Sequence, residues 1–116
     1  MLPRTHRINT DECNNILTKG VSVYTPFFSL RFIKYAHTEP FSSSFGVVVS
    51  KKVAKTAVER NRLKRRSREI IRSFLSKIQP NFKVMVFVSA AAKKLKKDQF
   101  LEELRVVLVK AGILMP

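Results

Sequence analysis

The sequence predicts an α+β fold, a single-domain α/β sandwich with its elements in the order α-β-β-β-α-β-α on one sheet. Four segments have the alternating or continuously apolar pattern of strands, at residues 21–24, 27–35, 45–50 and 82–88. Segments with helical periodicity precede, separate and follow them. The chain of 116 residues is 45% hydrophobic and contains nine Phe, which suffices for one domain with one modest core.

The first predicted helix is short, with Thr10 as its N-cap and Gly20 as the glycine that ends it in the left-handed region. Its apolar side contains Cys13 and Leu17. Cys13 is the single cysteine of the chain, which excludes an internal disulfide and a zinc cluster. We interpret it as a small buried apolar residue. Residues 1–9 are interpreted as a flexible basic arm.

The second strand, at residues 27–35, has two different faces. Its even-numbered apolar residues share one face, whereas Arg31 and Tyr35 lie on the other. Aromatic side chains stack on bases and Arg contacts phosphates, so this second face is a candidate RNA surface. A half-buried strand of mixed exposure has the same pattern, and the sequence favours neither interpretation. The next strand, at residues 45–50, is almost wholly apolar, which predicts a central strand covered on both sides.

The last helix is predicted to begin at the N-cap Asp98 and to stop at Gly112. Its apolar stripe is interpreted as core and comprises Phe100, Leu101, Leu104, Val107, Leu108 and Ala111. The connection before it, at residues 89–97, contains four lysines. These lysines either add non-specific affinity for a polyanion or are merely solvated.

A strongly basic segment at residues 50–72 carries the main functional signal. It contains ten Lys or Arg and two Glu. Thr56 and Glu59 form a Ser/Thr-x-x-Glu capping box, and no Pro or Gly follows until Pro80, so a long helix is predicted. At ~100° per residue, an apolar side containing Leu63 lies opposite a row formed by Asn61, Arg65, Arg68 and Arg72.

This basic row predicts contact with a nucleic acid. Solvated helix faces usually mix both charge signs, but two Glu cannot neutralise ten cations. The whole chain has 23 Lys and Arg against 8 Asp and Glu, a formal net charge of +15, so an acidic partner is expected. The sequence has no apolar run of ~20 residues and no N-terminal signal segment. This favours nucleic acid over membrane lipid and predicts a cytoplasmic protein.

No catalytic site and no metal site are predicted in the polypeptide itself. His6 and His37 have neither a carboxylate pair nor a Cys at motif spacing. The acidic residues are mostly explained by helix starts, where they interact with the helix dipole. We therefore expect the protein to support another catalyst or to present a substrate to it.

Two motifs in the basic segment resemble the protein subunit of bacterial ribonuclease P. They are Ser50-Lys51-Lys52 at a strand end and Arg60-Asn61-Arg62-Leu63-Lys64-Arg65 within the basic helix. The resemblance extends from Arg7 to Gly112 and includes Gly20, Gly46-Val47 and the valine-rich strand at residues 82–88. It implies a mixed four-stranded sheet with a left-handed βαβ crossover, a rare handedness that the second domain of a small-subunit ribosomal protein shares.

The resemblance also implies a function. In this family an RNA uses Mg²⁺ to hydrolyse a phosphodiester and remove the 5′ leader of precursor tRNA, and the protein binds both the catalytic RNA and the leader. No membrane contact and no obligate protein partner are expected. Carried over to this chain, the positions that contact RNA are Lys51, Lys52, Arg60, Asn61, Arg62, Lys64, Arg65 and Arg68, and Arg72 continues their row.

The single-stranded leader is implied to lie in a cleft between the first helix and the sheet. Here the chain departs from the family pattern. Cys13 and Leu17 stand where aromatic residues are frequent on the first helix, and Arg31 replaces one on the second strand. We expect weaker base stacking and a more electrostatic grip on the leader.

Two other classes of protein share some of these features. A small ribosomal protein or a DNA-binding architectural protein would explain the charge. Neither explains why Ser50-Lys51-Lys52 and Arg60-Asn61-Arg62 occur together at this spacing. A protein-only nuclease would need carboxylates that hold two catalytic metal ions, and the sequence contains no such cluster.

Overall fold

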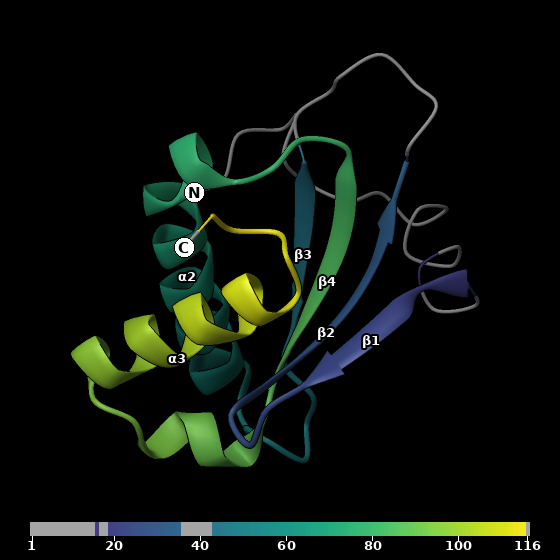
Figure 1. Cartoon of the computed structure of the whole chain (residues 1–116). Helices are drawn as coiled ribbons and strands as arrows, with labels where there is room; N and C mark the ends of the chain where they lie inside the picture. The colour runs from purple at the N-terminus through teal and green to yellow at the C-terminus, as the bar shows by residue number, and fades with distance from the viewer. Residues whose placement is uncertain (1–15, 17–18, 36–42, 116) are drawn as a thin grey trace.

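The computed structural model describes residues 16, 19–35 and 43–115. These residues form two layers, with two α-helices packed on one face of a four-stranded sheet (Figure 1). Ile16 and Lys19 are helical. The rest of the predicted first helix, the basic arm and both histidines lie outside the described residues.

The sheet has the strand order β1-β2-β4-β3. β1 (Val21–Tyr24) and β2 (Phe28–Lys34) form an antiparallel hairpin, β2 pairs antiparallel with β4 (Phe82–Val88), and β4 pairs in parallel with β3 (Ser44–Val48). The four predicted strands are confirmed, but the predicted central position of β3 is wrong. β3 is an edge strand, and its apolar sequence is explained because Phe45 and Val47 enter the core while the basic helix packs beside it.

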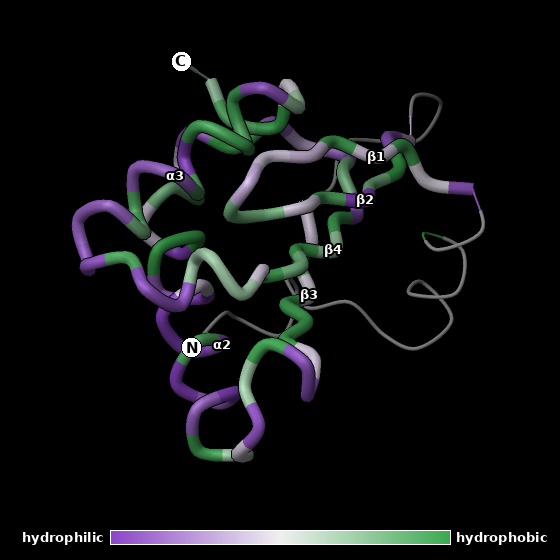
Figure 2. Tube along the Cα trace, turned by 90° about the horizontal axis from the view of Figure 1, so that it is seen from below, coloured by the Kyte–Doolittle hydropathy of each residue, from purple (hydrophilic) through white to green (hydrophobic). Residues whose placement is uncertain are grey.

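The basic helix α2 (Ala57–Ser73) connects the parallel strands β3 and β4. Figures 1 and 2 show that this crossover is left-handed, as expected. Thr56 caps the helix, since its Oγ1 accepts a hydrogen bond from the Glu59 N–H at 3.2 Å. The second half of the predicted capping box does not form, because the Glu59 carboxylate lies 3.1 Å from Lys93 Nζ. After Ser73 the chain continues into a short 3₁₀ turn, η2 (Leu75–Lys77).

The last helix α3 (Lys97–Lys110) begins one residue before the predicted cap. Asp98 lies in its first turn, and the Lys96 N–H at the N-cap donates to Gln99 Oε1 at 3.2 Å. Gly112, with φ of 78°, ends the helix as predicted. The apolar stripe is core except for Leu101, which is 37% exposed. The lysine-rich connection before α3 contains a second 3₁₀ turn, η3 (Ala90–Lys94).

Gly20 follows the first helix, but not in the left-handed conformation that the sequence predicts. A Cβ at this position would lie 2.3 Å from the carbonyl oxygen of Ile16, to which the Gly20 N–H donates at 2.8 Å. Glycine is therefore required by close backbone approach rather than by a positive φ.

The core lies between the sheet and the two helices. Phe28 of β2 and Phe100 of α3 are fully buried and meet edge to face, with ring centroids 5.0 Å apart. Figure 2 shows hydrophobic residues along the strands and hydrophilic residues along α2 and the start of α3. One face of the sheet is thus covered by the two described α-helices. On the other face Met85 is buried, at 6% exposure, whereas Arg31 and Phe87 are half-buried.

Candidate nucleic-acid interface

The basic row of α2 is on the surface, as the helical periodicity predicts. Asn61 and Arg65 are exposed and Arg68 is half-buried; together with Glu69 they line an open hollow of about 360 Å³. Arg72 is exposed in the last turn, where a cation interacts favourably with the helix dipole. The row and the hollow form one continuous cationic surface on a rigid element.

No ion pair among the described residues neutralises the charge of this row. Among the described residues, ion pairs join Glu59 to Lys93 and Glu102 to Arg105, and neither pair belongs to the row. In the second pair, hydrogen bonds from Arg105 lower the pKa of Glu102, and the carboxylate in turn raises the pKa of Arg105. The row therefore keeps its charge for an external partner.

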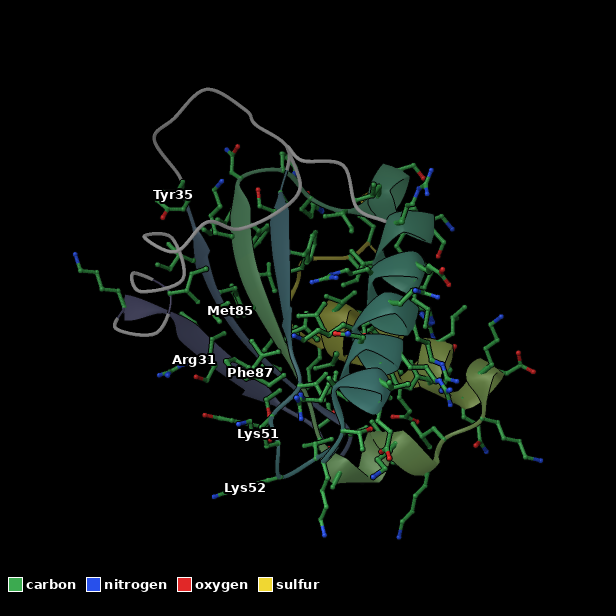
Figure 3. The ribbon with its side chains drawn as sticks, turned by 180° about the vertical axis from the view of Figure 1, so that it is seen from behind. Arg31, Tyr35, Lys51, Lys52, Met85 and Phe87 are labelled. Atoms are coloured by element: carbon green, nitrogen blue, oxygen red, sulfur yellow. The ribbon has the colours of Figure 1, made fainter. Side chains whose placement is uncertain are left out.

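Lys51 and Lys52 extend the cationic surface beyond the helix. Both are exposed in the loop between β3 and α2, at one end of the sheet (Figure 3). The loop is a tight turn, because the N–H groups of Val53 and Ala54 both donate to the Ser50 carbonyl at 3.1 Å. The two lysines consequently project from a fixed backbone.

The three residues of the Arg-Asn-Arg motif have different environments. Asn61 and Arg62 are exposed, whereas Arg60 is half-buried. Arg60 Nη1 donates to the carbonyl oxygens of Ala54 and Lys55, at 3.0 and 3.2 Å. The structure thus gives Arg60 a role in holding the loop, and its direct contact with RNA stays a prediction. Lys64, which follows in the same helical motif, is half-buried.

The sheet face opposite the helices contains Arg31, as the alternation predicts. Arg31 of β2 lies beside Met85 of β4, and Phe87 lies two residues further along β4, next to Ser29 (Figure 3). Arg31 is half-buried, and its Nε is buried without a hydrogen-bond partner among the described residues. A guanidinium N–H in this state favours a ligand with an acceptor oxygen.

Met85 and Phe87 were not identified as site residues from the sequence. The alternation within residues 82–88 separates them from the core residues, but only the strand order brings them next to Arg31. Cys13 and Leu17, the other two predicted cleft residues, lie outside the described residues. The described part of the cleft is therefore a sheet surface with Arg31, the buried Met85 and the half-buried ring of Phe87. The register with Ser29 places the exposed Tyr24 on the same face, and the strand alternation places Tyr35 there as well.

The described part of the chain contains neither a metal site of the usual kind nor a membrane-spanning helix. No group of three or more His, Cys, Asp or Glu side chains is placed so that it could hold a metal ion. No described helix has the length and apolar character needed to cross a membrane.

A two-layer α+β domain with a cationic helix at one edge of its sheet defines a class of small basic proteins suited to an anionic polymer. Comparison with known proteins identifies the family within this class. The family model described as Ribonuclease P matches residues 2–112, so the chain belongs to the ribonuclease P protein family. Its members are protein components of a ribonucleoprotein that processes tRNA.

Relatives and solved structures agree with this assignment. The ribonuclease P protein component of Pseudanabaena is 33% identical over 115 residues, which covers 98% of this chain and 97% of the relative. That of Synechococcus elongatus is 34% identical over 116 residues, with 97% and 95% covered. The Staphylococcus aureus RNase P protein superposes with a TM-score of 0.83 at 28% identity, covering 97% of this chain and 100% of that chain. The Thermotoga maritima protein, 24% identical with a TM-score of 0.70, supports the fold.

Proposed function

We propose that this chain binds the catalytic RNA of ribonuclease P through α2 and the loop before it, and the 5′ leader of precursor tRNA across the sheet face opposite the helices. In this way it assists removal of the leader by the RNA. The observation that carries the proposal is the exposed row of α2, whose charge is not neutralised within the described residues. Fixed cations of this kind replace condensed counterions along a phosphate backbone.

The polypeptide acts through electrostatics in this proposal. Cations on a rigid helix and a tight loop reduce the repulsion between crowded phosphates, which lowers the concentration of Mg²⁺ that the RNA needs. The Mg²⁺ ions belong to the RNA, and the protein supplies no catalytic group. The proposal also places the protein in the cytoplasm, where the precursor RNA is made, without an obligate protein partner.

The sheet face opposite the helices supports leader binding that combines base stacking with contacts to charge. The half-buried Phe87 offers a stacking surface for a base, and the guanidinium group of the half-buried Arg31 offers positive charge to a phosphate or hydrogen bonds to a base edge. Tyr24 and Tyr35 lie on the same face, but Cys13, Leu17 and Arg31 stand where the family often has aromatic residues. We therefore expect charge to contribute more to leader affinity than it does in relatives with aromatic clefts. Leader affinity should therefore fall steeply as the salt concentration rises.

The test replaces Arg62 and Arg65 together with Ala. Each lost phosphate contact removes ~0.7–0.9 from the slope of log affinity against log salt, so the double variant should lose about 1.4–1.8 in binding to the catalytic RNA. Lys77→Ala is the matched control, because Lys77 is an exposed cation beyond the end of α2. Circular dichroism should be the same for all three proteins. A folded double variant with the slope of the control would show that Arg62 and Arg65 are only part of a solvated face.

A further inference from the structure

A second hollow, of about 380 Å³, lies on the flank of α2 near η3. It is lined by Glu59, Arg62, Leu63, Arg66 and Lys93. Arg66 and Lys93 belong neither to the outward row nor to the loop surface described above. The hollow combines three cations with one carboxylate, so an excess of positive charge remains after Glu59 is paired.

Two of the three cations are held in place before any ligand binds. Lys93 Nζ lies 3.1 Å from Glu59 Oε2 and donates to the Val53 carbonyl at 3.2 Å. The Arg66 guanidinium carbon lies 5.2 Å from the ring centroid of the buried Phe100. These contacts restrict the two side chains, so less conformational entropy is lost when they bind an anion.

Stability alone is a weak explanation for this arrangement. Both side chains of the Glu59–Lys93 pair are 44% exposed, and ion pairs with such exposure add little to folding free energy. Arg62 is exposed and has no ion pair among the described residues. The hollow therefore presents a net positive charge to solvent, because its single carboxylate does not neutralise all three cations.

We propose that this hollow binds a phosphate group of the catalytic RNA, with Arg66 and Lys93 as its new contacts. The inference rests on the proposed function and adds a second contact surface to it. Arg65 and Arg66 are separated by ~100° around the helix axis. The outward row and the hollow would therefore contact different stretches of phosphate backbone. Binding on two flanks fixes the rotation of α2 against the RNA, which a single row of contacts does not.

The experiment measures the salt dependence of binding to the catalytic RNA for Arg66→Met, Glu59→Gln and the control Lys77→Met. Methionine keeps an apolar chain over Phe100 and removes the charge. Arg66→Met should lower the slope by ~0.7–0.9, and Lys77→Met should leave it unchanged. Glu59→Gln should tighten binding at low salt, because it removes the single carboxylate of the hollow. A purely structural ion pair would instead lower the melting temperature of this variant without tightening RNA binding.

Three outcomes would overturn the inference or its basis. If Arg66→Met is folded and has the slope of Lys77→Met, the hollow is not a phosphate site. If the loss appears only in binding of precursor tRNA to the assembled enzyme, the hollow contacts substrate and not the catalytic RNA. If the unmodified protein fails to bind the catalytic RNA, the proposed function fails first, and this result is distinguishable from the other two.

Discussion

Replacing Arg60 with Ala should destabilise the fold, whereas replacing Arg62 should not, although both belong to one motif. Arg60 Nη1 donates to the carbonyl oxygens of Ala54 and Lys55. Arg62 is exposed in a hollow and makes no such backbone contact among the described residues. The two variants remove the same charge and gain the same helix propensity, so their difference isolates the loop contact.

The magnitude follows from the two hydrogen bonds. A bond from a charged donor contributes ~1.5–3 kcal/mol when well protected. Here one nitrogen serves both acceptors, and the bond to Lys55, at 3.2 Å, is exposed. We therefore expect a loss of ~1–1.5 kcal/mol for Arg60→Ala, which corresponds to a fall in melting temperature of roughly 3–6 °C for a domain of this size.

Urea unfolding and thermal unfolding of the two variants and the unmodified protein measure this difference. Salt-dependent binding to the catalytic RNA, measured on the same samples, should show the larger slope change for Arg62→Ala. If Arg60→Ala is as stable as Arg62→Ala and loses an equal slope, Arg60 is a direct phosphate contact and the loop contact is not populated in solution.

Three further predictions concern the scaffold. Ser43→Ala should cost ~1–3 kcal/mol in urea unfolding, because the buried Phe82 N–H loses the Ser43 Oγ acceptor at 3.0 Å; an unchanged midpoint would contradict this. Gly112→Ala should lower the free energy of unfolding by ~1–2 kcal/mol. The cause is the positive φ alone, since no atom lies within 4 Å of the added Cβ. A calorimetric loss clearly smaller or larger than this would contradict the prediction. Arg105 lowers the pKa of Glu102, so the small stabilisation by this pair is present above the ordinary Glu pKa and is lost as the pH falls through the lowered one. The difference in unfolding midpoint between Glu102→Gln and the unmodified protein should accordingly vanish in acid.

Much of the fold could be predicted from the sequence because local patterns determine it. The alternation in β2 and the cap at Thr56 identify their elements without reference to distant residues. The edge position of β3 could not be predicted, because an apolar run is equally consistent with a central strand and with an edge strand beside a helix. The close approach at Gly20 likewise depends on backbone atoms that periodicity does not place.

The candidate site was predictable in its helical part and less so elsewhere. The row containing Asn61 and Arg65 follows directly from 3.6-residue periodicity. The inward turn of Arg60 could not be predicted, since it depends on the path of the preceding loop. Phe87 and Lys93 reach their surfaces through strand order and through η3, which are tertiary features.

The strand order has a consequence for synthesis of the chain. β4 is the last strand to be made, yet it lies between β2 and β3. The β1–β2 hairpin can form early, but β3 has no pairing partner until β4 has left the ribosome, and α2 emerges before the strand that completes its docking surface. A nascent chain at this stage exposes an unpaired strand edge together with a loose basic segment, a combination prone to aggregation and to indiscriminate RNA contacts. We therefore expect selective RNA recognition to arise late, in the same step that closes the sheet.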